Sequence, residues 1–250
     1  MCAPEYAGFY TEALLYMPFF SNPLNDHRRV FASFIQDSPQ PRHSKLQARS
    51  QLLGLPPTTF VYASFNSAYK LCPAVFAAWA KIIRTSTPTR PCALWLLQWP
   101  GVEENIRRSA LSLGVRDNSL VFTPLLPQDS HLQTKSDVTD LFLDTFSFNG
   151  HGTVSQVLWA AIPTLTLPKQ RLGQRIGAAL VTHSAAPELV ARTEAEYVAL
   201  AQACATRRGR ARVRQMRQRL HEARAASPLF DIPRYVSDYE RLLSRYKKKT

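Results

Sequence analysis

The fold of this chain is decided by residues 148–168, FNGHGTVSQVLWAAIPTLTLP. The pattern predicts a loop, a helix and a strand in succession, and the apolar run Leu141–Asp144 before it predicts a further strand. Gly150 and Gly152 let the backbone approach a ligand closely. Free N–H groups at the start of the helix would favour an anion, above all a phosphate. An ordinary strand-to-helix turn with His151 on the surface fits the same spacing, because short glycine-containing motifs are weakly specific.

The residue types of this region carry more information than their spacing. Its segments Leu143–Thr145, Asn149–His151 and Val157–Ala160, followed by Pro163, resemble the signature of the protein O-GlcNAc transferases, glycosyltransferase family 41. Members of that family transfer N-acetylglucosamine from UDP-GlcNAc to Ser and Thr residues of proteins. The resemblance covers roughly residues 5–246.

Length and composition indicate a globular protein. A chain of 250 residues, of which 45% are hydrophobic and 20% charged, can bury a full core. The four cysteines have no metal-like spacing, which predicts free thiols in a reducing compartment. The sequence shows neither a secretory signal pattern nor an apolar run near the ~18 residues of a membrane span. We therefore expect a location in the cytoplasm, the nucleus or both.

Positive charge is concentrated near the C-terminus. The net charge is +13, and residues 207–250 account for +10 of it, with 14 Lys and Arg against four Asp and Glu. The arginines between Arg207 and Arg219 could track a nucleic-acid backbone. No aromatic side chains that would stack on bases are interleaved with them. A solvated helix face is therefore the favoured interpretation, and nucleic acid is not an expected partner.

Strand and helix patterns alternate from residue 53 onward. Apolar runs such as Ala93–Leu97 are typical of strands that are covered on both faces. The alternation predicts an α/β fold, a Rossmann-like parallel sheet with helices on both faces, followed by a helical C-terminal extension. By the resemblance, this is the C-terminal half of a GT-B glycosyltransferase. Strands are expected at 60–65, 93–97, 120–122, 141–144 and 164–167, and helices at 74–84, 103–113, 130–136, 194–205, 207–225 and 232–246.

We divide the chain into four parts. Residues 1–35 resemble the tail end of the family's N-terminal catalytic lobe, and 36–52 are polar and predicted to be a linker. Residues 53–225 are the predicted nucleotide-sugar-binding Rossmann-like domain, and 226–250 form a closing C-terminal helix and basic tail. No internal repeat is present, although complete members of the family usually carry helical repeats before the catalytic region.

The segment FNSAYK, residues 65–70, is the first candidate binding element. A lysine at the carboxyl end of a strand can neutralise a diphosphate, both during binding and as UDP departs. Taken without the resemblance, a single lysine is more often a solvated surface residue. The resemblance implies that Lys70 holds the UDP phosphates and that Asn66 lies beside the donor.

Two further elements complete the implied donor site. In the loop 124–131, Leu126 and His131 would hold the nucleoside. After the predicted strand at 141–144, the phosphate cradle and the ribose contact would come from His151, Gly152, Thr153 and Gln156. The resemblance makes Lys70 and His151 the catalytic candidates.

Several positions depart from the family pattern. Ser67 replaces a glutamine, Gln128 a lysine, Thr134 an arginine and Gln156 an acidic residue. Each change removes or weakens a ligand contact, and a lost hydrogen bond commonly costs ~0.5–1.5 kcal/mol. Gly152 stands where the family has a threonine, which keeps the amide but loses a hydroxyl.

The implied function is a glycosyltransferase lobe that binds UDP-GlcNAc for inverting transfer of GlcNAc to protein Ser and Thr. No metal ion or other cofactor is implied, because no carboxylate cluster suited to Mg²⁺ stands beside the phosphate site. The implied partners are the UDP-sugar donor, protein acceptors, and the missing N-terminal lobe with its helical repeats. Two alternatives stay open: a catalytically degenerate nucleotide- or protein-binding module, and a basic RNA-associated module.

Overall fold

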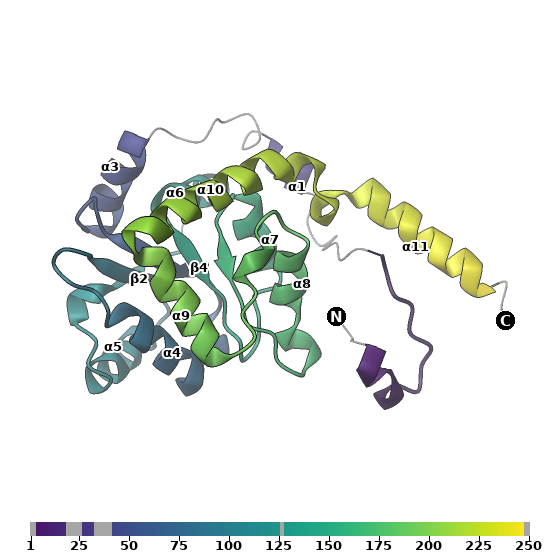
Figure 1. Ribbon diagram of the computed structural model, residues 1–250, viewed down its shortest axis with the longest axis horizontal. Coiled ribbons are helices and arrows are strands. Elements are labelled where there is room, and N and C mark those ends of the chain that lie inside the picture. The colour runs from purple at the N-terminus through teal and green to yellow at the C-terminus, as the bar shows by residue number, and fades with distance from the viewer. Residues whose placement is uncertain (1–3, 19–26, 33–41, 126–127, 248–250) are drawn as a thin grey trace.

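The computed structural model describes residues 4–18, 27–32, 42–125 and 128–247. Within these residues, five parallel strands form one sheet in the order β3-β2-β1-β4-β5 (Figure 1). This confirms the predicted α/β fold with a parallel sheet. The strands are β1 (Phe60–Ser64), β2 (Cys92–Leu97), β3 (Leu120–Thr123), β4 (Leu141–Leu143) and β5 (Thr164–Leu165).

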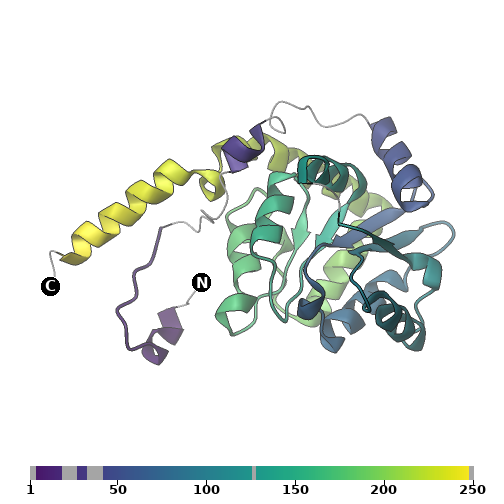
Figure 2. The same cartoon turned by 180° about the vertical axis from the view of Figure 1, so that it is seen from behind.

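Helices cover both faces of the sheet, as Figure 2 shows from behind. Because crossovers between parallel strands are right-handed, α4 (Pro73–Ile83) and α5 (Glu103–Ser112) cover one face. The opposite face carries α6 (Gln128–Val138) and α7 (Gly152–Trp159). The other α-helices of the described residues are α1 (His27–Val30), α3 (Arg42–Leu53), α8 (Ile176–Thr182), α9 (Glu194–Ala205), α10 (Arg207–Ala223) and α11 (Ile232–Lys247).

The core forms where the apolar runs of the sequence predict it. Every residue of β1, β2 and β4 is buried, as expected for strands covered on both faces. Trp79, Trp95 and Trp159 are among the largest fully buried side chains. Pro73 occupies the first turn of α4, where its missing N–H costs no hydrogen bond. Gly114, at φ +72°, follows the end of α5.

The structure differs from the sequence prediction in the region expected to be a linker. Residues 42–53 form α3, and the buried side chain of Arg49 ties this helix to the domain. Arg49 donates hydrogen bonds to the carbonyl oxygens of Val138 (3.0 Å) and Thr59 (3.1 Å). It also pairs with Asp140 at 2.6 Å. The polar composition did not predict this helix, because one of the side chains that attach it to the domain is a buried arginine.

Two element boundaries also differ. Helix α6 extends over 128–138, which is longer than the short helix expected at 130–136. Strand β5 ends at Leu165, and Thr166 continues only as an isolated bridge to Val190. Both differences lie at the ends of elements, where local pattern is least informative.

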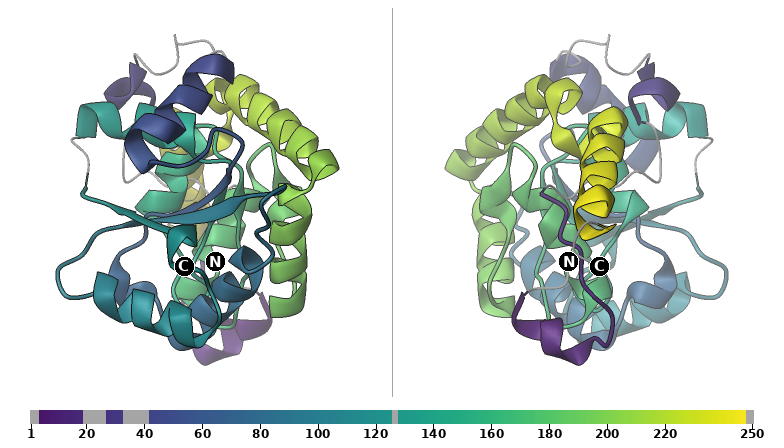
Figure 3. Two further views of the ribbon diagram at one scale, coloured as in Figure 1. Left: turned by 90° about the vertical axis from the view of Figure 1, so that its left-hand side faces the viewer. Right: turned by 90° about the vertical axis from the view of Figure 1, so that its right-hand side faces the viewer.

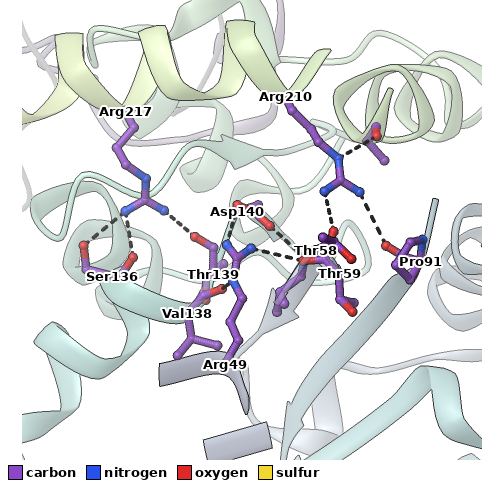
Figure 4. A network of polar contacts seen from close by, with 12 residues as sticks. Arg49, Thr58, Thr59, Pro91, Ser136, Val138, Thr139, Asp140, Arg210 and Arg217 are labelled. Atoms are coloured by element: carbon purple, nitrogen blue, oxygen red, sulfur yellow. Dashed lines mark hydrogen bonds and ion pairs between the residues drawn. The ribbon is translucent and has the colours of Figure 1, made fainter. Parts of the chain in front are cut away.

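Helix α10 crosses the amino-terminal edge of the sheet, and its arginines are not all solvated as the sequence pattern suggested. Arg210 donates to the carbonyl oxygen of Thr58 at 2.6 Å, just before β1. Arg217 donates to the carbonyl oxygens of Ser136 (2.8 Å) and Thr139, before β4 (Figure 4). Together with Arg49 they hold the loops that enter the sheet. The expectation of a solvated face holds for the exposed residues Arg207, Arg208, Arg212, Arg214 and Arg219.

Two segments project from the same side of the body (Figures 1 and 3). One is the N-terminal segment 4–18, in which Phe9, Leu15 and Tyr16 are exposed. The other is α11, whose apolar stripe includes the exposed side chains of Val236 and Tyr239. Helix α11 has no buried residue among those described, so neither segment contributes much to the core of this domain.

Candidate donor site at the carboxyl edge of the sheet

The candidate site lies where β1 and β4 end side by side. These two strands pair directly. From β1 the chain adds β2 and β3 on one side, and it then crosses over to add β4 and β5 on the other side, so the strand order reverses between β1 and β4. Such a reversal leaves a crevice beyond the carboxyl ends of the strands, where open α/β sheets bind their ligands. The loops 65–72 and 144–151 meet there.

A buried carboxylate, Asp144, organises the loop after β4. One of its oxygens accepts hydrogen bonds from the amides of Thr145 (3.0 Å) and Gly150 (2.7 Å) and from the side chain of Asn66 (3.1 Å). The other oxygen accepts from the hydroxyl of Thr166 at 2.8 Å. Burial raises the pKa of Asp144 to about 6, although these hydrogen bonds oppose the shift. The carboxylate therefore joins the loops after β1, β4 and β5.

Lys70 is held rigidly at the same edge. Its side chain is 8% exposed, and Nζ donates a 2.8 Å hydrogen bond to the carbonyl oxygen of Asn149. Nζ also lies 4.8 Å from the centre of the Phe148 ring. Burial lowers the pKa of Lys70, and the charge of Asp144 partly restores it. An anion at this edge would meet a lysine that is already positioned and incompletely neutralised.

His151 marks the junction between this loop and α7. It is the N-cap residue of the helix, and its ring stacks on Phe148 with centroids 4.9 Å apart. Burial and the neighbouring charge of Lys70 lower its pKa, so the imidazole is mostly neutral near pH 7. The first backbone hydrogen bond of α7 is donated by the amide of Ser155 to the carbonyl oxygen of His151. The amides of Gly152, Thr153 and Val154 precede that bond and are available to a ligand.

Among the buried polar atoms that have no hydrogen-bond partner within the described residues, two belong to predicted site residues at this edge. They are Oδ1 of Asn66 and Nε2 of His151. An unpaired buried polar atom costs roughly 1–3 kcal/mol. Their position beside the free amides of α7 is consistent with a polar ligand that satisfies them.

The structure brings most of the predicted site residues to one edge. Lys70 and Asn66 follow β1, while His151, Gly152, Thr153 and the partly exposed Gln156 begin α7. Leu126 lies outside the described residues, and of His131 only its position in the first turn of α6 is described. The sequence reasoning quoted Asp144 as part of the signature but missed its role in the network. An acidic residue directly after a buried strand was the available signal.

The residues that the structure describes contain no group of three or more His, Cys, Asp or Glu that could hold a metal ion. Their cysteines, Cys72, Cys92 and Cys204, are free. None of the helices in these ranges is long and apolar enough to cross a membrane.

Comparison with solved structures supports the architecture. The chain is similar to an O-GlcNAc transferase mutant, K341M, from Thermobaculum terrenum, with a TM-score of 0.73 and 23% identity. That match covers 96% of this chain and 43% of the other. A glycosyltransferase from Rickettsia africae matches 84% of this chain with a TM-score of 0.58 at 8% identity. The fold is therefore that of one half of a GT-B glycosyltransferase.

Sequence comparison identifies the family. The model of glycosyl transferase family 41 matches residues 35–239, and the chain belongs to this family. A Caenorhabditis elegans UDP-N-acetylglucosamine–peptide N-acetylglucosaminyltransferase is 32% identical over 210 residues, 84% of this chain. A probable enzyme of the same description from Arabidopsis thaliana, SEC, is 29% identical over 95% of the chain. The chain spans only 18% and 23% of the lengths of these two relatives.

Proposed function

We propose that this chain is the donor-binding lobe of a protein O-GlcNAc transferase-like enzyme, with UDP-GlcNAc as its donor. The observation that carries the proposal is the placement of Lys70. Its ammonium is fixed on the carbonyl oxygen of Asn149, three residues before the first of the free amides that begin α7. A buried cation beside a helix N-terminus suits the two phosphates of a nucleotide sugar.

The proposed chemistry is attack of a protein Ser or Thr hydroxyl on the anomeric carbon of the sugar, with inversion, while UDP departs. Lys70 and the amides of Gly152 and Thr153 would stabilise the charge that develops on the diphosphate. Neutral His151 would donate or accept a hydrogen bond at the phosphates, and Gln156 would contact the ribose. In this proposal the positive charge comes from the protein, and no metal ion is included.

The acceptor side of the reaction is proposed to come from outside this chain. The region shared with this chain makes up only 23% and 18% of the lengths of the two family relatives. The exposed apolar side chains of segment 4–18 and of α11 are proposed to contact the N-terminal lobe of the complete enzyme. The helical repeats would belong to the same missing part. Protein acceptors would bind to the complete enzyme, in the cytoplasm or nucleus.

A second candidate is a lobe that binds a nucleotide without turnover. The polar residues that the family uses at the donor are altered in this chain at Ser67, Gln128, Thr134 and Gln156. These changes favour weakened binding, and they leave Lys70 and His151 in place. Titration with UDP tests both candidates, because each requires binding.

The deciding experiment is calorimetric titration of the folded chain with UDP. We expect binding that depends little on salt, and Lys70→Ala should weaken it at least tenfold, since a phosphate-paired cation contributes ~1.5–3 kcal/mol. Lys81→Ala, at an exposed position of α4, is the matched control. A folded sample that gives no heat with millimolar UDP would remove the donor from the proposal.

Turnover provides a separate test. The isolated chain should not incorporate labelled GlcNAc into peptides, because the other wall of the cleft is proposed to lie in the missing lobe. Incorporation by this chain alone would show that its residues suffice for the acceptor side, contrary to the proposal.

A further inference from the structure

Lys135 is a buried lysine that none of the preceding roles uses. It lies on α6 with 2% of its surface exposed. Its ammonium lies 4.2 Å from the centre of the Phe65 ring. Burial is the one cause of its pKa shift, with no contribution from a charged or hydrogen-bonding partner among the described side chains. Burial of an ammonium against an aromatic face costs free energy, because the desolvation penalty of the charge greatly exceeds the cation–π attraction.

The direction of this side chain places the ammonium near the donor site. Helix α6 starts after β3, at the carboxyl edge of the sheet, and ends at the amino edge, where Arg49 binds the carbonyl oxygen of Val138. Long helical side chains lean toward the N-terminus of their helix, so Lys135 points back to the carboxyl edge. Phe65, which it contacts, directly precedes Asn66 of the candidate site.

The surroundings of Phe65 support this location. Its ring packs edge-on against Trp95, with centroids 4.9 Å apart. The indole of Trp95 in turn donates a 2.8 Å hydrogen bond to the hydroxyl of Thr123, the last residue of β3. The ammonium of Lys135 therefore belongs to the layer of side chains directly beneath the carboxyl edge.

We propose that Lys135 is a second cation of the donor site, neutral while the site is empty and protonated when a nucleoside diphosphate binds. The inference rests on the proposed function, because it takes the carboxyl edge as the place of the nucleotide. It assigns to the site a group that couples donor binding to uptake of a proton from solution.

The charges around Lys135 support this behaviour. Burial lowers its pKa to about 7. On its own helix, Asp137 accepts hydrogen bonds from Gln133. Asp129 and His131 are in the first turn of α6, where the structure describes no side chain. On the neighbouring α3, Arg49 is paired with Asp140.

Among the side chains that the structure describes, those of α7 and of the sheet add no compensating charge. Helix α7 and the five strands contain no Asp, Glu, Lys, Arg or His. Their titratable groups, Tyr62 and Cys92, have raised pKa values and stay neutral. Asp144, after β4, is held by four donors. An arriving diphosphate would thus supply the anion that raises the pKa of Lys135.

The test is titration of the chain with UDP at pH 8 in two buffers of different ionisation enthalpy. The difference in apparent binding enthalpy between the buffers gives the number of protons taken up. With a pKa near 7 in the empty site, Lys135 should take up most of one proton per UDP. UDP affinity should accordingly fall as the pH rises from 8 to 9, by up to about tenfold. At these pH values UDP itself is fully ionised and contributes no uptake.

Lys135→Met is the decisive variant. It should bind UDP with proton uptake near zero and with affinity that is flat between pH 8 and 9. Lys81→Met, which removes an exposed lysine, should behave as the unaltered chain. Lys135→Met should also melt at a higher temperature, because an apolar side chain replaces a buried amine. That melting curve verifies the fold before titration.

Three results would overturn the inference. UDP binding without proton uptake in the unaltered chain would show that Lys135 does not titrate with the nucleotide. Uptake that persists in Lys135→Met would assign the proton to another group, and the buried Lys70 is the first rival. Uptake with uridine, which lacks phosphate, would exclude the diphosphate as its cause. Failure of UDP to bind at all would instead reject the proposed function on which the inference rests.

Discussion

The carboxylate of Asp144 accepts a 2.7 Å hydrogen bond from the amide of Gly150, six residues later in the chain. This bond closes the loop after β4 and sets the direction in which the chain enters α7. A Cβ at Gly150 would fall within 3 Å of the Asn66 side chain, which is itself bound to Asp144. The loop is therefore packed tightly around the carboxylate, and two substitutions at Asp144 separate its shape from its charge.

The stability of the Asp144→Asn variant, relative to that of the unaltered chain, should increase as pH rises. The folded-state pKa of Asp144 is about 6, above its ordinary value of 3.8, so the folded state holds this proton more tightly than the unfolded state. The contribution of Asp144 to stability is thus largest below about pH 4 and is lost as pH rises to about 6. The uncharged amide avoids that loss. Chemical unfolding at pH 4.5 and 7.5 should show the difference in stability grow in favour of Asn by about 2 kcal/mol.

Asp144→Ala is the companion variant. It removes the acceptor altogether and leaves the amide of Gly150 and the hydroxyl of Thr166 buried without it. It should be destabilised by at least about 2 kcal/mol at both pH values. For Asp144→Asn, a stability relative to the unaltered chain that falls as pH rises would refute the raised pKa of Asp144.

Gly209→Ala should destabilise the domain severely. A Cβ at this position would overlap the backbone carbonyl oxygen of Ala203, where α9 and α10 meet. Backbone cannot give way as a flexible side chain can, and overpacking of this kind costs about 1–3 kcal/mol or more. Gly152→Ala, which meets nothing within 4 Å, is the control and should melt within a few degrees of the unaltered chain. Equal melting temperatures for the two variants would contradict the close approach of the two helices.

Arg217→Met should destabilise the domain by about 2–4 kcal/mol. The guanidinium binds the carbonyl oxygens of Ser136 and Thr139 just before β4, and these acceptors would lose a charged donor. Arg214→Met, on the exposed face of the same helix, should change stability by no more than about 0.5 kcal/mol. Urea unfolding of both variants measures the contrast. Matching losses would show that α10 is anchored by its apolar residues alone.

Gln156→Asp should tighten UDP binding severalfold. The substitution restores a carboxylate where the family places one against the ribose, and a charged acceptor forms the stronger hydrogen bond. Gln156 is partly exposed in the first turns of α7, where an added negative charge also suits the helix dipole. Calorimetry with UDP and with pyrophosphate separates the two contributions, because only UDP should gain affinity. Unchanged or weaker UDP binding would show that the ribose is not held at this position.

The sequence by itself determined the sheet and the edge of it at which the candidate site residues lie. Strands buried on both faces need unbroken apolar runs, and such runs are readable at 60–64 and 92–97. Proline at the start of α4 and glycine after α5 set two boundaries for local reasons of backbone geometry. Lys70 and His151 could be placed at one edge because parallel strands all end on the same side.

The tertiary structure decided what each polar side chain does. Arg49 and Arg214 are equally polar in the sequence, yet one is buried on the carbonyl oxygens of two loops and the other is exposed. Likewise nothing local distinguishes Lys135 from Lys81. Only the packing of α6 over the sheet removes the first from water and lowers its pKa. The environment of a charge depends on residues far away in the chain, so the local sequence pattern cannot contain it.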